Sequence, residues 1–139
     1  MSNVKYNSAG RAIAKNDLDT VTFKVMFVDP SYTPNPDTEV YLSDVVANRA
    51  SGSTDVTLAG LNILLNNTDN ATDFDFNDIV SGSGTFTTDG VILYIDTGVE
   101  ATSELICFLD LLSSGTPTTF SVIAGVLTGT VNARGLFSI

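Results

Sequence analysis

Histidine is absent from this 139-residue chain, and so is tryptophan. Without histidine the chain lacks the commonest general base and the commonest metal ligand. Basic residues are scarce as well, because six Lys and Arg stand against sixteen Asp and Glu, for a net charge of −10. An acidic protein repels nucleic-acid phosphates, so we expect no nucleic-acid partner. These absences argue against an enzyme of the histidine-dependent or phosphate-binding kind, and no GxxxxGK loop occurs.

Cysteine and long hydrophobic runs are also lacking. Cys107 is the single cysteine, which excludes an intrachain disulfide, and its apolar neighbours predict a buried, unreactive thiol. Apolar runs are far shorter than the roughly 20 residues of a membrane span, so we expect no membrane partner. Polar residues follow Met1, which predicts no signal peptide and synthesis in a cytoplasm. No residue pattern calls for a cofactor.

Strand-forming patterns dominate what remains. Hydrophobic residues make up 43% of the chain and charged residues 16%, which excludes a disordered polymer. Apolar residues alternate over 21–28, where Asp29-Pro30 ends the pattern, and a short helix is predicted near Ser43. Asp89-Gly90 predicts a hairpin turn. Further strands are predicted over 56–58, 61–65, 73–77, 85–87, 91–95, 105–112, 120–131 and 136–139.

This succession predicts an all-β, single-domain antiparallel β-sandwich or jelly-roll-like barrel with at most one short helix. The β-sandwich domain is expected over 17–139. Residues 1–16 are predicted to form an N-terminal basic arm, because the net charge is +2 over residues 1–28 and −13 over 29–110. Lys5, Arg11 and Lys15 are the arm's candidate partner-binding residues, although an ordinary mobile terminus explains the pattern as well.

The segment 105–112 is apolar on both faces. Ile106, Phe108 and Leu112 lie on one side of the predicted strand, opposite a second apolar row. Such a strand is either central in a sandwich or covered by a partner subunit. We therefore predict these three residues as a candidate self-association strand.

An acidic run over 69–78 is the one constellation suggestive of chemistry. Asp73, Asp75 and Asn77 match the first three ligand positions of a calcium loop, but Asp78 replaces its glycine and Gly84 its closing glutamate. A solvated strand face is the favoured interpretation, and a hard-cation site and catalytic carboxylates are the alternatives. We predict neither a metal site nor catalytic residues.

Four blocks of sequence, in order and spacing, resemble the small virion structural proteins of tailed bacteriophages. The blocks are Phe23–Val28 with Tyr32-Thr33-Pro34 and Leu42–Asn48, Phe74–Ile79, Val91–Gly98 with Ser103–Leu111, and Gly135–Ile139. The chain departs from that pattern in the short Arg49–Ser53 loop and in lacking a tryptophan after Ile79-Val80.

The resemblance implies a capsid decoration, or cement, protein at the capsid surface of a virion. Such proteins bind the outer face of the capsid as oligomers, usually trimers, and tie neighbouring capsomers together. The implied partners are the phage major capsid protein and further copies of the chain itself. The basic arm is then expected to reach an acidic patch of the capsid protein.

Two other functions stay open at this stage. A tail or neck adaptor that forms a ring would have a similar composition. A carbohydrate-binding adhesion module would need exposed aromatic side chains, for which Tyr6, Tyr32 and Tyr41 are the candidates.

Overall fold

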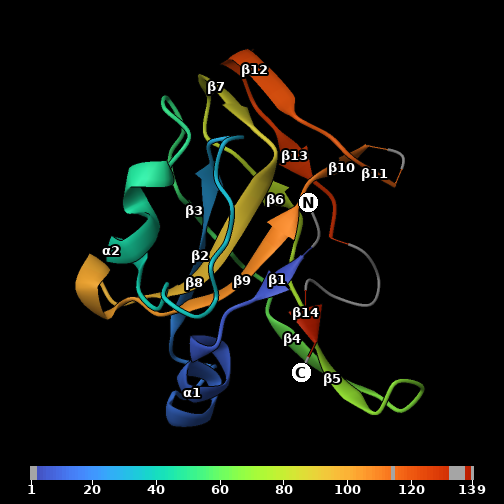
Figure 1. The fold of residues 1–139 in the computed structure, drawn as a ribbon. Coiled ribbons are helices and arrows are strands. Elements are labelled where there is room, and N and C mark those ends of the chain that lie inside the picture. Colours follow the sequence, from blue (N-terminus) through green and yellow to red (C-terminus); the bar gives the residue numbers. More distant parts are fainter. Residues whose placement is uncertain (1–2, 114, 132–136, 139) are drawn as a thin grey trace.

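Five antiparallel strands form the central sheet of the computed structural model, which describes residues 3–113, 115–131 and 137–138 (Figure 1). Their order across the sheet is β1-β9-β8-β2-β3. The strands are β1 (Val4–Lys5), β2 (Thr22–Val28), β3 (Val56–Thr57), β8 (Gly90–Asp96) and β9 (Leu105–Asp110). The strands predicted over 21–28 and 91–95 are therefore confirmed, and they occupy the middle of this sheet. The strand predicted over 105–112 is confirmed only as far as Asp110, because Leu112 and Ser113 belong to a separate strand.

Strand β2 pairs with β8 along its whole length, and both faces of this pair are buried. Phe27 lies opposite Val91 and faces one side, whereas Met26 lies opposite Ile92 and faces the other. Since side chains alternate along a strand, burial on both sides requires apolar residues at successive positions. This pair needs a cover on each face.

An outer layer of four small antiparallel sheets covers the first face. Buried aromatic and aliphatic side chains of this layer, among them Phe74, Phe76 and Phe86, pack on the row that contains Phe27. The described strands of this layer are β4 (Asn62–Asn66), β5 (Ala71–Asp75), β6 (Ile79–Val80), β7 (Gly84–Thr88), β10 (Leu112–Ser113), β11 (Thr116–Pro117), β12 (Phe120–Gly125), β13 (Thr128–Gly129) and β14 (Phe137–Ser138). Their orders are β14-β5-β4, β12-β7, β13-β6 and β10-β11.

The long connection between β2 and β3 covers the other face. It contains α2 (Leu42–Val45) and the 3-10 turn η1 (Val46–Asn48), which confirms the short helix predicted near Ser43. The Asp44 carboxylate accepts hydrogen bonds of 2.9 Å from the backbone N–H groups of Val40 and Tyr41, and so fixes the start of α2. Leu42 and Val45 are buried against Met26 and its neighbours.

The architecture is an all-β single domain, mostly strand and antiparallel, as predicted. It contains two short α-helices, one more than expected. The unpredicted helix is α1 (Ser8–Lys15), whose buried face consists of the small residues Ser8, Ala9 and Ala12. The Ser8 hydroxyl donates a 2.8 Å hydrogen bond to the carbonyl of Leu105 and so holds the helix against β9. Ala9, Ala12 and Ile13 recur at helical spacing, so the periodic signal for this helix is present in the sequence, although small side chains carry most of it.

Described residues 3–16 do not form a separate arm, contrary to the prediction for 1–16. Val4 and Lys5 form the edge strand β1 beside β9, with Lys5 opposite Cys107. Tyr6 is fully buried, and α1 packs on the same strand. The opening segment is therefore part of the domain.

The Asp89-Gly90 pair does not form a hairpin turn. Strand β7 pairs with β12, and β8 pairs with β2 and β9, so the chain crosses from the outer layer to the central sheet at Asp89. A Cβ on Gly90 would lie 2.4 Å from the ring of Phe108. Glycine is required here for space under an aromatic ring rather than for turn geometry, and sequence alone does not separate the two uses.

The self-association strand predicted over 105–112 is corrected by burial. Ile106 and Phe108 are 0% exposed within the chain itself, so their side chains are not available to a partner in this fold. Strand β9 is central in the sandwich, which was the first of the two interpretations. Leu112 lies beyond its end and is 54% exposed.

Alanine substitutions will separate these two environments. Phe108→Ala is expected to lower the free energy of unfolding by about 3–5 kcal/mol, because it leaves a cavity in a closed core. Leu112→Ala should change it by less than about 1 kcal/mol. Urea unfolding of both variants measures the difference, and equal losses would contradict the burial described here.

Candidate interaction surface

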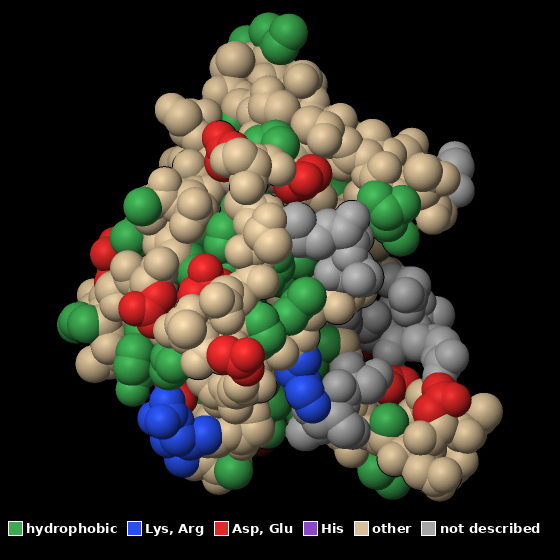
Figure 2. All heavy atoms as spheres, in the orientation of Figure 1, with side chains coloured by type: hydrophobic (Ala, Val, Ile, Leu, Met, Phe, Trp, Pro, Cys, Tyr) green, Lys and Arg blue, Asp and Glu red, His purple; other side chains and the backbone are tan. Residues whose placement is uncertain are grey.

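Large apolar side chains are exposed on the outer layer, on strands that project from the body (Figure 1). Leu65 on β4 is 82% exposed and Ile123 on β12 is 81% exposed. We call the exposed residues of this layer the outer apolar set: Ile63, Leu65, Val80, Leu112, Ile123 and Val126. Figure 2 shows hydrophobic side chains at the outer ends of these projections. Single exposed apolar residues are ordinary. The members of this set lie on four different small sheets, with β12 and the β4–β5 hairpin at opposite ends of the molecule in Figure 1, so they offer several separate contact sites rather than one patch.

A bulge in β12 turns Ile123 outward. The register with β7 shifts between Val122 and Gly125, and Ala124 adopts a left-handed backbone with φ of 44°. The Ala124 N–H is held by a 2.9 Å hydrogen bond to the Thr85 hydroxyl. A non-glycine residue in this region is strained, and bulges of this kind re-aim side chains at functional edges.

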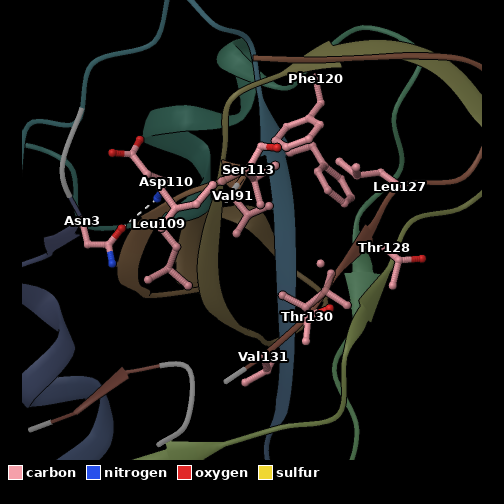
Figure 3. Close-up of a pocket in the computed structure, with 15 residues that line it drawn as sticks. Asn3, Val91, Leu109, Asp110, Ser113, Phe120, Leu127, Thr128, Thr130 and Val131 are labelled. Atoms are coloured by element: carbon pink, nitrogen blue, oxygen red, sulfur yellow. Dashed lines mark hydrogen bonds between the residues drawn. The ribbon is translucent and has the colours of Figure 1, made fainter. Parts of the chain in front are cut away.

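A cavity of about 380 Å³ lies between the central sheet and the outer layer. Figure 3 shows Val91 and Leu109 of the central sheet facing Phe120, Leu127 and Val131 across it. Its lining also includes Asn3, whose side-chain oxygen accepts a 2.8 Å hydrogen bond from the Asp110 N–H (Figure 3). The lining is mixed, because Asp110, Ser113 and Thr128 stand beside the apolar side chains, and it does not by itself specify a ligand.

The three basic residues predicted to bind a partner, Lys5, Arg11 and Lys15, lie on two different elements and have different contacts. Arg11 and Lys15 on α1 both form ion pairs with Glu104, and the Arg11 Nε lies 2.9 Å from its Oε2. Lys5 lies on β1 instead, with an exposed side chain. Figure 2 shows Lys and Arg side chains gathered near α1. Arg11 and Lys15 remain about half exposed, so these pairs leave part of each side chain accessible.

Glu104 is the acidic residue that these two cations neutralise. Its side chain is 3% exposed, and such burial alone would raise the pKa of its carboxyl group. Hydrogen bonds from Lys15 and Arg11 outweigh burial and leave this pKa below its ordinary value. The sequence pattern did not reveal the pairing, because 93 residues separate Arg11 from Glu104.

The acidic run over 69–78 is built into a hairpin rather than a closed cation site. Asn66 donates from its amide nitrogen to Asp69 and to Asp73, each at 3.0 Å. Asp73 is buried, so the predicted solvated face does not hold at that position. Asp78 accepts a 3.0 Å hydrogen bond from the Val131 N–H. Among the described residues, no group of three acidic, cysteine or histidine side chains is placed to hold a metal ion.

Buried tyrosine networks tie the long connection to the central sheet, and sequence reasoning missed them. The hydroxyls of Tyr6 and Tyr32 hydrogen-bond at 2.5 Å, and Tyr32 donates to Glu39 at 2.6 Å. Burial raises the pKa of both tyrosines above the ordinary value. Tyr6 and Tyr32 are therefore core residues and are not exposed in loops, which corrects their role as candidate sugar-stacking aromatics.

A second network joins the sheet to the loop before β3. Arg49 binds Asp55 with two hydrogen bonds of 2.8 and 2.9 Å, and the Tyr94 hydroxyl donates to the same carboxylate at 2.6 Å. This bidentate geometry fixes the Arg49–Ser53 loop against the body.

Two further titratable groups are shaped by burial. Cys107 is buried, and burial raises the pKa of its thiol to about 12, which matches the predicted unreactive role. Burial, and secondarily the Asp110 carboxylate, also raises the pKa of Asp89 above its ordinary value. Both effects suppress charge inside the fold.

Comparison searches find no protein-family model, no curated protein and no solved structure that matches this chain. Within the described ranges, none of the helices has the length and apolar character needed to cross a bilayer.

Glu104 should make stability depend on pH. Because its pKa is lower in the folded than in the unfolded chain, its contribution is present above the unfolded value and is lost as pH falls through the folded value. Glu104→Gln should therefore cost about 1 kcal/mol at pH 7, a value discounted for its solvent-exposed cations. The cost should shrink as the pH falls through the folded pKa of Glu104, because the carboxyl group is then protonated in both states.

Glu100→Gln is the matched control, because it removes the same charge at an exposed position of η2 (Glu100–Thr102). Thermal unfolding from pH 2.5 to 7 compares the variants. A Glu104→Gln profile parallel to that of the unsubstituted chain would contradict the assigned role of this carboxylate.

Proposed function

We propose that this chain is a structural protein whose function is assembly with other protein surfaces, and that its place is the outer face of a phage capsid. It binds there as an oligomer, a trimer, and cements neighbouring capsomers. The major capsid protein and further copies of the chain are its partners. The virion placement rests on the four-block resemblance, and the assembly role rests on the exposed surface.

The outer apolar set is the observation that carries this proposal. Leu65 and Ile123 are both more than 80% exposed, the first on the β4–β5 hairpin and the second on the β7–β12 strand pair. Burying one such side chain in a partner contributes about 1.5–3 kcal/mol. Several weak contacts of this size give firm attachment when an oligomer engages many sites at once, because each bound copy raises the effective concentration of the next.

The charge distribution supports the same role. A net charge of −10 per chain keeps free oligomers from aggregating before they bind the shell, through mutual repulsion. Within the described residues, the outer apolar set lies on strands β4, β6, β10 and β12 or just beyond them, and these strands carry no Asp, Glu, Lys or Arg. Apolar contacts can therefore form there without burying a charge.

A ring-forming tail or neck adaptor is the alternative that the same surface supports. An electron-microscopy reconstruction of the virion separates the two. Decoration predicts density at many equivalent sites over the head, whereas an adaptor predicts a single ring. A carbohydrate-binding module is less favoured, because the fold buries Tyr6 and Tyr32 and leaves Tyr41 half-buried.

Charge introduced into the outer apolar set should abolish assembly without unfolding the domain. Ile123→Asp is expected to weaken binding to shells of the major capsid protein at least tenfold, about 1.4 kcal/mol, because the contact would bury an unpaired carboxylate. Val99→Asp is the matched control, since Val99 is 56% exposed but lies away from the outer layer. Co-sedimentation with shells that lack this chain measures occupancy.

Equal occupancy by the Ile123→Asp variant and the unsubstituted chain would overturn this use of the surface. Light scattering of the free protein is a second measurement, for which the proposal predicts a trimer.

A further inference from the structure

Strand β4 presents an unprotected edge. It pairs with β5 along one side without a register shift, and no described strand pairs with its other side. Its sequence, Asn62-Ile63-Leu64-Leu65-Asn66, contains no charge, proline or glycine. Soluble proteins normally protect such an edge with one of these residues or with a bulge, because its free N–H and C=O groups recruit another strand. This edge is thus suited to strand addition.

The sequence of β4 is self-complementary about its central residue. When two β4 strands pair antiparallel with Leu64 opposite Leu64, Ile63 of each copy lies opposite Leu65 of the other. Asn62 then lies opposite Asn66 at both ends. Amide meets amide and apolar meets apolar at every position, which is the condition for a two-fold interface between identical chains.

Pairing would also cover Leu65, the most exposed large apolar side chain among the described residues. Ile63 lies opposite Phe74, and Phe74 stacks on Phe137 at 4.5 Å, so this face of the small sheet continues from the core. Leu65 extends past the body on the same face, 82% exposed. Two paired copies would place Ile63 and Leu65 of each chain side by side, and the apolar stripe would run through both.

We propose that two copies of this chain associate through antiparallel β4–β4 pairing centred on Leu64, which joins their β14-β5-β4 sheets into one six-stranded sheet. This inference rests on the proposed self-assembly and identifies the β4 edge as the surface through which two copies associate. A two-fold contact joins two chains and does not close a ring of three, so it links copies that belong to neighbouring trimers.

The self-complementary sequence of β4 identifies a second copy as the occupant, whereas charge and area set the strength of the contact. Asp69, Asp73 and Asp75 lie in the β4–β5 hairpin or on β5, so two copies approach with like charges flanking a neutral strand. Salt should therefore strengthen pairing, whereas it would weaken pairing with a basic partner. A pair of five-residue strands buries less than the roughly 1,200 Å² of a stable interface. The contact is accordingly weak in solution and gains strength where copies are concentrated on a shell.

Disulfide trapping of the full chain tests the register. In the proposed pair, the two Leu64 Cα atoms lie about 4.5–5.5 Å apart, which is within reach of a disulfide. The two Leu65 Cα atoms are offset by two residues and lie about 8 Å apart, which is too far. Cys107 is buried and is the same in every variant. Leu64→Cys should form a covalent dimer at least tenfold faster than Leu65→Cys, although Leu65 is more exposed, and faster still at 0.5 M salt.

A mixing experiment guards against a Leu64→Cys variant that folds poorly. Ile63→Cys and Leu65→Cys proteins should cross-link to each other when mixed, because these positions oppose one another, and should cross-link slowly when alone. Unfolding curves of the reduced variants check the fold. The proposal would be overturned if Leu65→Cys formed the dimer faster than Leu64→Cys. It would also be overturned if neither Leu64→Cys nor the mixture formed a dimer, which is the result expected if β4 binds a strand of a different protein.

The capsid assay is independent of this outcome. Failed trapping with intact shell binding overturns β4 pairing alone. Successful trapping without shell binding overturns the capsid location alone.

Discussion

The structure depends on one constraint, which is that strands β2, β8 and β9 are apolar on both faces and must be covered on both sides. Gly90 lies directly against the ring of Phe108, and Met26 and Phe27 face opposite covers. A sheet of this kind cannot leave a face to solvent without exposing a full row of large side chains. The long connection with α2 covers one face, and the outer strands cover the other.

The two covers differ in construction, and that difference locates the interaction surface. The connection is fixed by buried polar networks, such as Tyr6–Tyr32–Glu39, which hold it closely to the sheet. The outer layer is divided into four small sheets with open edges, and its hairpins extend beyond the core that they cover. The overhanging parts keep strand-forming apolar residues that have no partner within the described chain. Assembly is the physical use for such residues, and β4 is the clearest example.

Charge contributes differently from what its distribution along the sequence indicated. The basic opening segment was expected to reach outward, but Arg11 and Lys15 neutralise the buried Glu104. A carboxylate at 3% exposure requires such partners, so part of the basic excess serves the fold. The asymmetry of charge was evident in the sequence. Its use was not, because the acid and its cations are remote in the chain and meet only when α1 packs on β9.

The sequence by itself determined the class, the burial of Cys107 and the positions of the long strands β2 and β8, because alternation and apolar runs are local properties of a few residues. It did not reveal the two-residue strands β1 and β11. It located the doubly apolar run at 105–112 but left open what covers it. Tertiary structure decided that Ile106 and Phe108 are covered from within, that β7 pairs with β12 rather than β8, and that Asn62–Asn66 is an edge. Strand pairing joins residues that are distant in sequence, so a local pattern does not indicate which two strands pair. The five residues of β4 would also be compatible with a central strand. They form an exposed edge only because β4 lies at the end of its sheet.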